Sequence, residues 1–160
     1  MSATNLTWTG QLLHIYTATS AGETMTPLQD VQAIAGVGLG GDRYATGQGR
    51  YSDRPHENRQ VTLIEAEVLD ALQRDHNIEL RPEETRRNLI TQGVPLNHLV
   101  GKEFQVGDVT LYGGRLNVPC TYLEKVVDKP VFKPLINRSG LNCQILTGGT
   151  IRTGDPSTPA

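Results

Sequence analysis

The chain has 160 residues, of which 15 are basic and 17 acidic, and its formal net charge at pH 7 is -2. A chain this close to neutrality has no overall field that attracts polyanions, so general binding to nucleic acid or to a membrane surface is not expected. No apolar run is long enough to span a membrane, and the N-terminal sequence MSATNLTWTG lacks the charged and apolar regions of a signal peptide. We therefore expect a cytoplasmic protein with one domain, residues 1–160, and flexible ends at 1–7 and 155–160.

Short β-branched segments recur between glycines and prolines, which is typical of a mostly antiparallel β protein. The predicted strands lie at residues 10–18, 31–35, 88–91, 103–106, 109–112, 115–117, 140–146 and 150–153. The sequences VGDV at 106–109 and TGGT at 147–150 predict turns, each joining two strands in a hairpin. Strands this short and numerous favour a mainly β barrel or sandwich with a few helices.

Three segments predict helical structure. Thr62 and Glu65 form a capping-box pattern, and apolar residues follow at helical spacing as far as about His76. The charged side chains of this helix, Glu65 among them, are expected on a solvated face. Pro82 predicts a short helical turn with acidic residues after it, and TYLEKVV predicts a further helix directly after Cys120.

The segment at residues 36–60, GVGLGGDRYATGQGRYSDRPHENRQ, is long, rich in glycine and contains four arginines. It begins with a G-x-G-x-x-G pattern, which binds dinucleotides only between a strand and a helix. Because Asp42, Arg43 and the glycines that follow are expected to continue as a loop, we reject a dinucleotide site. The segment is either a disordered loop or a loop that becomes ordered around a ligand.

Arginine makes up eleven of the fifteen basic residues, and its planar fork suits paired hydrogen bonds to phosphates and ring systems. In RRNLIT, residues 86–91, alternation along a strand directs Arg86 and Asn88 to one side and Arg87 to the other. Arg86 and Asn88 could then converge on one ligand. The alternative is a salt-bridged start of a strand, with Glu83 and Glu84 as partners.

The two cysteines have different surroundings. Cys143 alternates with Leu141 and Ile145, which predicts a position in the core. Cys120 follows Pro119 and precedes a predicted helix, and a helix N-terminus generally favours the thiolate, the form that binds soft metals or attacks electrophiles. The alternative for Cys120 is a passive, partly buried side chain.

Other kinds of site lack support in the sequence. The four histidines have no spacing that would place two on one helix face or turn, and none neighbours a cysteine, so a zinc site is not expected. The serines lie in polar loops without a nucleophile-elbow pattern, so Ser/His/Asp catalysis is not expected either. Two cysteines do not make a disulfide framework.

Several fragments, in order along residues 36–155, resemble the MOSC domains, which are named for the C-terminal domain of molybdenum cofactor sulfurases. The fragments are GDRY, RQVTLIEAEVL, RRNLITQGVPLNHLVGKEFQVGDVTLYG, NVPCTYLE and RSGLNCQILTGGTIRTGD. The resemblance implies a MOSC-type β-barrel with a few peripheral helices.

The resemblance also implies that the chain binds the molybdenum cofactor, in which the dithiolene sulfurs of a pterin hold the metal. Cys120 matches the cysteine of the family, which ligates molybdenum or carries a persulfide sulfur. Arg86 and Asn88 match the R-x-N segment that holds the pterin, and the arginines of residues 43–59 are expected to supply further donors. The remaining residues expected to bind the cofactor are Arg59, Arg115, Asn117 and Arg138.

The implied function is that of a molybdenum-dependent oxidoreductase, with Cys120 at the catalytic centre, that reduces N-hydroxylated substrates with electrons from an external donor. The alternative is a carrier or insertion module that passes sulfur or cofactor to a recipient protein through a Cys120 persulfide, without turnover of its own. A third hypothesis is a domain that keeps the fold and binds another anion.

The sequence shows neither the pyridoxal-phosphate-dependent domain of the sulfurases nor the N-terminal β-barrel of the amidoxime-reducing members. We therefore expect some cofactor contacts to be absent or supplied by another subunit.

Overall fold

The computed structural model describes residues 7–160, and residues 1–6, which make up most of the expected flexible N-terminal end, lie outside the described residues. The strands in the described part are β1 (Gly10–Thr17), β2 (Thr26–Leu28), β3 (Asp30–Ile34), β4 (Gly38–Leu39), β5 (Val61–Glu65), β6 (Leu89–Gln92), β7 (Glu103–Val106), β8 (Val109–Leu116), β9 (Leu141–Thr147), β10 (Gly149–Arg152) and β11 (Pro156–Pro159). The helices are α1 (Arg43–Thr46), α2 (Ala66–His76) and α3 (Thr121–Val127), with 3-10 turns η1 (Glu57–Arg59), η2 (Pro82–Thr85) and η3 (Leu96–Leu99). No helix within residues 7–160 has the length and apolar character needed to cross a membrane.

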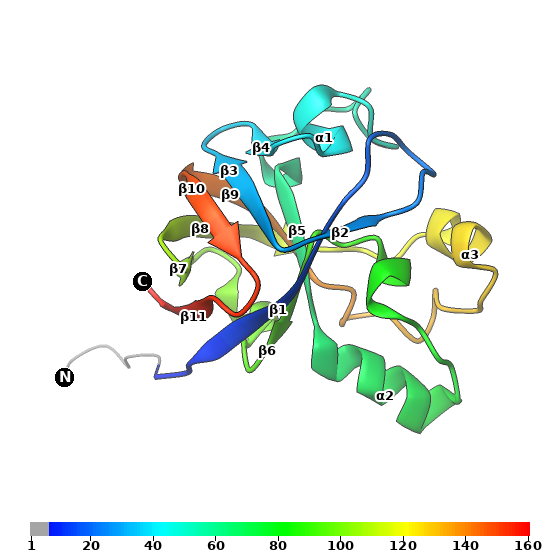
Figure 1. The fold of residues 1–160 in the computed structure, drawn as a ribbon. Helices are drawn as coiled ribbons and strands as arrows, with labels where there is room; N and C mark the ends of the chain where they lie inside the picture. Colours follow the sequence, from blue (N-terminus) through cyan, green and yellow to red (C-terminus); the bar gives the residue numbers. More distant parts are fainter. Residues whose placement is uncertain (1–6) are drawn as a thin grey trace.

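The main sheet closes into a barrel (Figure 1). In the described residues it has eight strands in the order β11, β7, β8, β9, β5, β6, β1, β2, and β11 also pairs with β1, which closes seven of them into a ring. Neighbouring strands are antiparallel except β5 and β6, which are parallel and are connected through α2. A small sheet of β10, β3 and β4 lies beside the barrel. The predicted mainly β barrel with a few helices is confirmed.

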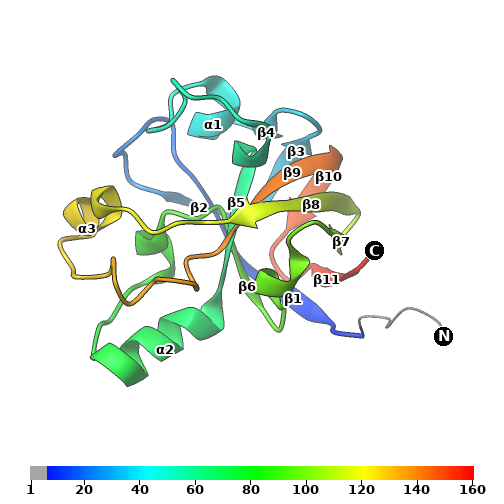
Figure 2. The same ribbon diagram turned by 180° about the vertical axis from the view of Figure 1, so that it is seen from behind.

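Two groups of buried side chains stabilise this arrangement. Strand residues such as Phe104, Leu111 and Leu63 are fully buried and fill the barrel. A second cluster, which includes Leu72 of α2 and Leu123 of α3, packs the helices on the outside of the barrel. Each such side chain contributes about 1.5–3 kcal/mol when it leaves water. Figure 2 shows α2 and α3 together on the side of the molecule away from β11.

The helix predicted to begin at Thr62 begins instead at Ala66, and the capping-box prediction was wrong. Thr62 lies within β5, where it pairs with Asn142, and Leu63 pairs with Leu89 of the parallel strand. Glu65 occupies the N-cap position but makes no side-chain capping hydrogen bond. Pairing with distant strands therefore determined the structure here, against a local helix signal.

Of the two predicted hairpins, one is confirmed and the other is wrong, and the C-terminal end also differs from expectation. VGDV does join β7 and β8 in a hairpin, with Val106 opposite Val109. TGGT does not, because β10 leaves the barrel and pairs with β3 instead of β9. Residues 155–160 were expected to be flexible, but Pro156–Pro159 form β11, whose pairing with β1 and β7 closes the barrel.

The glycine-rich segment at residues 36–60 is ordered. It contains β4, α1 and η1, so the expectation that Asp42 and Arg43 continue as loop is wrong. Asp42 is the N-cap of α1 and its carboxylate accepts a hydrogen bond from the backbone N–H of Tyr44, which explains why a helical turn begins there. The segment lies over the same end of the barrel as the connection to α3 (Figure 1).

Candidate functional site

A cavity of about 280 Å³ lies where the 36–60 segment meets the end of β8 and the start of α3. Pockets for small molecules usually measure roughly 300–1,000 Å³, so this cavity is at the small end of the range. The lining combines segments far apart in the sequence: Ala21, Arg43, Tyr44, Arg50, Tyr51, Arg59, Thr62, Arg86, Arg87, Arg115, Asn117, Val118, Pro119, Cys120, Tyr122, Leu123 and Asn142. The fold thus brings the 36–60 segment, the 86–88 segment and Cys120 to one place.

The lining of this cavity is strongly cationic. Six arginines contribute to it, and none of the lining residues that the structure describes is aspartate or glutamate. Among these arginines, only Arg43 makes an ion pair with a carboxylate within residues 7–160. Unpaired guanidinium groups in a concave, partly dry site favour an anionic ligand with several acceptor oxygens.

Arg86, which lines the cavity, has an unusual backbone conformation. Its φ of 59° is in the left-handed region, where a residue other than glycine is uncommon, and its N–H closes the η2 turn on the carbonyl oxygen of Glu83. Its Nη1 donates to the carbonyl oxygen of Glu23 at 2.7 Å. Its Nη2 is buried and has no hydrogen-bond partner among the described residues. Burial, and next the charge of Arg43, lower the pKa of Arg86.

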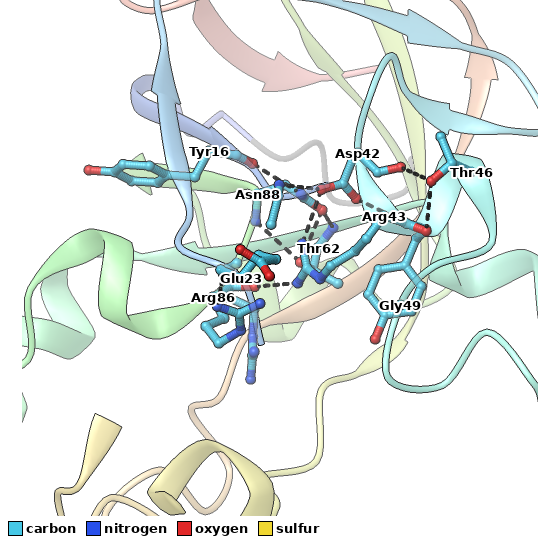
Figure 3. Close-up of polar contacts among 12 residues, drawn as sticks. Tyr16, Glu23, Asp42, Arg43, Thr46, Gly49, Thr62, Arg86 and Asn88 are labelled. Atoms are coloured by element: carbon cyan, nitrogen blue, oxygen red, sulfur yellow. Dashed lines mark hydrogen bonds and ion pairs between the residues drawn. The ribbon is translucent and has the colours of Figure 1, made fainter. Parts of the chain in front are cut away.

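A buried network of Asp42 and Arg43 holds the backbone of Arg86 (Figure 3). The Asp42 carboxylate, which is fully buried, accepts from Arg43 Nη1 at 3.0 Å and from the backbone N–H of Ala18 at 3.2 Å. Arg43 Nη2 then donates to the carbonyl oxygen of Arg86 at 3.1 Å. This network was not predicted, because Arg43 was expected only as one of several arginines that contact the ligand.

Asn88 does not line the cavity, so it does not converge with Arg86 there. It is 1% exposed, and its Oδ1 accepts from the N–H and hydroxyl of Thr62 while its Nδ2 donates to the carbonyl oxygen of Tyr16. Figure 3 shows Asn88 joining β1 to β5 through these bonds. The alternation argument fails because the left-handed residue Arg86 precedes the strand, which begins only at Leu89.

Arg87 lines the cavity together with Arg86, contrary to the prediction that the two side chains point to opposite sides. Its guanidinium donates to Thr85, Asn117 and Ser139. The pKa of Arg87 is lowered to about 10, chiefly because burial disfavours the charged form. It remains protonated at neutral pH.

Cys120 lies at the N-cap of α3 and lines the cavity, partly exposed. It makes no side-chain capping hydrogen bond to its own helix. Interaction with the side chain of Cys120, and next burial, raise the pKa of Tyr51. Cys143, by contrast, is fully buried and burial raises its pKa, which confirms the predicted core position.

Arginine side chains stack on the tyrosine rings of the cavity. Arg59 lies 5.4 Å from the ring centre of Tyr51, and Arg50 lies 5.1 Å from that of Tyr122. The tyrosines were not predicted as site residues, although the repeated Arg-Tyr pair at 43–44 and 50–51 was a visible signal. The stacked rings keep these guanidinium groups extended at the cavity.

Of the four other residues predicted to bind the cofactor, three line the cavity and one does not. Arg59, Arg115 and Asn117 line the cavity. Arg138 is not among the lining residues; it donates to the carbonyl oxygen of Pro134 at 2.7 Å and to Asp75 at 3.2 Å. The structure therefore gives Arg138 a bonding role between α2 and the segment that follows α3.

Comparison with known proteins adds independent information. The family model described as MOSC domain matches residues 39–158. The sequence matched none of the curated proteins with which it was compared.

Solved structures with a similar fold include the YuaD protein from Bacillus subtilis, which is 18% identical, with a TM-score of 0.79 over 94% of this chain and 97% of that one. YiiM from Geobacillus stearothermophilus is 14% identical, with a TM-score of 0.71 over 94% of this chain and 75% of that one. YiiM from Escherichia coli is 15% identical, with a TM-score of 0.69 over 98% and 70%. At these identities the structures are evidence for a shared fold.

Proposed function

Because the chain belongs to the MOSC domain family, we propose that its arginine-lined cavity binds the molybdenum cofactor, with Cys120 as the protein ligand to the metal. The proposal combines the cofactor that the family implies with the arginine donors and the thiol that this chain places in one cavity. The thiol of Cys120 is the soft ligand of the lining, and soft ligands suit a metal that is otherwise held by sulfur.

The observation that carries the proposal is the buried Nη2 of Arg86, which has no partner among residues 7–160. Leaving a buried charged donor unpaired costs at least about 1–3 kcal/mol, and the left-handed backbone of Arg86 adds strain. A ligand oxygen at this position would satisfy the donor. The absence of a carboxylate from the described lining supports an anionic ligand, and the pterin phosphate of the cofactor is one.

The other residues of the cavity fit the rest of the cofactor. Arg59 and Arg115 offer further forked donors for the phosphate and for the polar edge of the pterin. The rings of Tyr51 and Tyr122 also line the cavity, and the side chain of Tyr51 interacts with that of Cys120. When bound, the cofactor supplies two-electron redox chemistry, while the protein binds, orients and shields it.

We further propose that the loaded protein reduces N-hydroxylated substrates with electrons from a separate donor protein. This part follows from the family resemblance, and fold-level analogy is its support. The alternative, a carrier that holds a persulfide on Cys120, uses the same partly exposed thiol. The enzyme would turn over substrate with molybdenum on Cys120, whereas the carrier would hold an extra sulfur atom on Cys120 and would have no turnover.

The test is metal analysis and intact-protein mass spectrometry of protein purified from a host that makes the cofactor. We expect molybdenum in the wild type and in Cys143→Ala, the matched control for the buried thiol, and little in Cys120→Ser. A wild type that carries molybdenum and turns over a hydroxylamine or amidoxime with a chemical reductant supports the enzyme. An extra sulfur atom on Cys120, without turnover, supports the carrier instead. Molybdenum-free protein with an unmodified Cys120 would contradict both.

A further inference from the structure

The two neighbouring arginines of the cavity differ in how their donors are used. Arg87 Nε donates to the carbonyl oxygen of Ser139 at 3.0 Å, and its Nη1 donates to that of Thr85 at 3.1 Å. Its Nη2 donates to Asn117 Oδ1 at 2.6 Å and to Ser139 Oγ at 2.9 Å. Every nitrogen of this guanidinium is bonded to protein, whereas Arg86 Nη2 has no partner in the described chain.

Asn117, the main partner of Arg87, is similarly committed to the protein. Its Oδ1 also accepts from Ser139 Oγ at 3.1 Å, and its Nδ2 donates to Asn142 Oδ1 at 2.8 Å. Its backbone N–H donates to the carbonyl oxygen of Gly140 at 2.8 Å. Asn117 is thus fixed to β9 and to the segment before it, although it lies just beyond the last residue of β8.

This anchor fixes one end of the segment from Asn117 to Cys120, and at the other end Cys120 packs against the cluster that contains Leu123. Val118, the next residue, is 71% exposed and contributes little packing. Cys120 makes no capping bond to α3. Arg87 and Asn117 therefore restrain, on the side of the barrel, the stretch of chain that leads to Cys120.

We infer that Arg87 is a positioning residue, which fixes Asn117 and, through the short link that follows, the sulfur of Cys120, and that Arg86 is left to contact the ligand. This inference deepens the proposed function and rests on it only in taking Cys120 as the functional thiol. It assigns separate roles to two adjacent arginines of the same cavity wall. It also makes Asn117 a support of the site instead of a ligand contact.

The rate at which iodoacetamide alkylates Cys120 in cofactor-free protein tests the inference. Cys143 is fully buried, so Cys120 reports alone in the folded chain. Iodoacetamide reacts with the thiolate, and the substitutions used here keep the formal charge of the cavity, so a change in rate reports chiefly the position and accessibility of the sulfur. We expect Arg87→Lys and Asn117→Ala each to accelerate alkylation by about threefold or more, with the double variant no faster than the faster single one, because residues of one network are not additive.

Arg138→Lys is the matched control. Arg138 also bonds to the segment between α3 and β9, through Pro134, but within residues 7–160 it makes no hydrogen bond to Asn117. We expect its substitution to leave the Cys120 rate unchanged even where it lowers the melting temperature. An unchanged rate in Arg87→Lys, or a double variant whose acceleration is the product of the two single ones, would overturn the inference.

A second pair of variants tests the same network if Arg87→Lys does not fold. Ser139 Oγ donates to the same Asn117 oxygen, so Asn117→Ala and Ser139→Ala should again be non-additive, and independent effects would reject the network. The rates need no bound cofactor. Coupled rates in a protein that never binds molybdenum would retain the positioning role and reject the proposed function, whereas molybdenum binding with uncoupled rates would do the reverse.

Discussion

Arg86 and Glu23 are joined by a hydrogen bond of 2.7 Å from Nη1 to a carbonyl oxygen, and the neighbouring Nη2 of Arg86 has no partner among residues 7–160. One end of the guanidinium is thus anchored, and the other is buried without a partner in the described chain. The backbone of Arg86 is held by Arg43, which is in turn paired with the buried Asp42. The protein therefore keeps a strained, partly unsatisfied cation in the cavity, which is the pattern expected of a residue retained for binding and not for stability.

Arg86→Gly tests this division between stability and binding. Glycine adopts the left-handed backbone without strain, so we expect the free energy of unfolding to stay within about 1 kcal/mol of the wild type while molybdenum content falls about tenfold or more. Asn77→Gly is the control, because Asn77 also has a positive φ but lies at the end of α2. Urea unfolding and metal analysis are the measurements. Full metal retention in Arg86→Gly would contradict the role of Arg86.

Asp42→Asn should weaken the support of Arg86. The substitution leaves the guanidinium of Arg43 buried without its carboxylate, and we expect it to cost about 3 kcal/mol of unfolding free energy. Asp53→Asn, in the same segment but without an ion pair to Arg43, is the control and should have little effect. A stability loss in Asp42→Asn no larger than in the control would show that the pair is not structural.

Asn88→Ala distinguishes a structural role from a cofactor contact. Three hydrogen bonds to Thr62 and Tyr16 would be lost from a fully buried site, so we expect a loss of about 2–3 kcal/mol in unfolding free energy. The molybdenum content of the protein that remains folded should be unchanged. Reduced molybdenum per folded molecule would instead support Asn88 as a residue that holds the pterin.

Glu65 should make stability depend on pH. Burial, and next the charge of Glu67, raise its pKa to about 7, against a hydrogen bond from the Leu96 backbone that lowers it. This contradicts the expectation of a fully solvated carboxylate. Since the folded-state pKa lies above the unfolded value, the stabilisation is complete below about pH 4.5 and is lost as pH rises through 7.

The loss between these pH values should be on the order of 1–2 kcal/mol, because water still reaches part of the carboxyl. Urea unfolding of the wild type and Glu65→Gln from pH 5 to 8 measures it, and the variant should lack this component. Asp70→Asn on the exposed face of α2 should keep it. Equal pH dependence in the wild type and Glu65→Gln would remove Glu65 as the source.

Much of the barrel was predictable because strand signals are local. Alternation and turn residues placed the strands near residues 10–18, 103–106 and 109–112 within a few positions of the observed ones. The errors lie where pairing is non-local. The capping-box pattern at Thr62 could not reveal that Val61 pairs with Cys143, and PSTP has no apolar signal for the strand that closes the barrel.

The cavity-lining residues were predictable where a matched motif identifies them, and were not predictable where their placement depends on backbone conformation or on distant segments. Cys120, Arg86, Arg59 and Arg115 came from matched segments, and they line one cavity. The opposed placement of Arg86 and Arg87 rested on strand alternation, which a single positive φ at Arg86 invalidated. The bonds that take Arg138 and Asn88 away from the cavity come from distant segments, which the sequence does not bring together.

The sulfur coordination of molybdenum, measured by X-ray absorption at the metal edge, tests the central claim most directly. The account predicts that the residual molybdenum in Cys120→Ser has one sulfur ligand fewer than the molybdenum in the wild type. A control with Cys143→Ala should match the wild type, since Cys143 is sealed in the core. An identical sulfur count in Cys120→Ser and wild type would show that Cys120 is not the ligand and would contradict the proposed site.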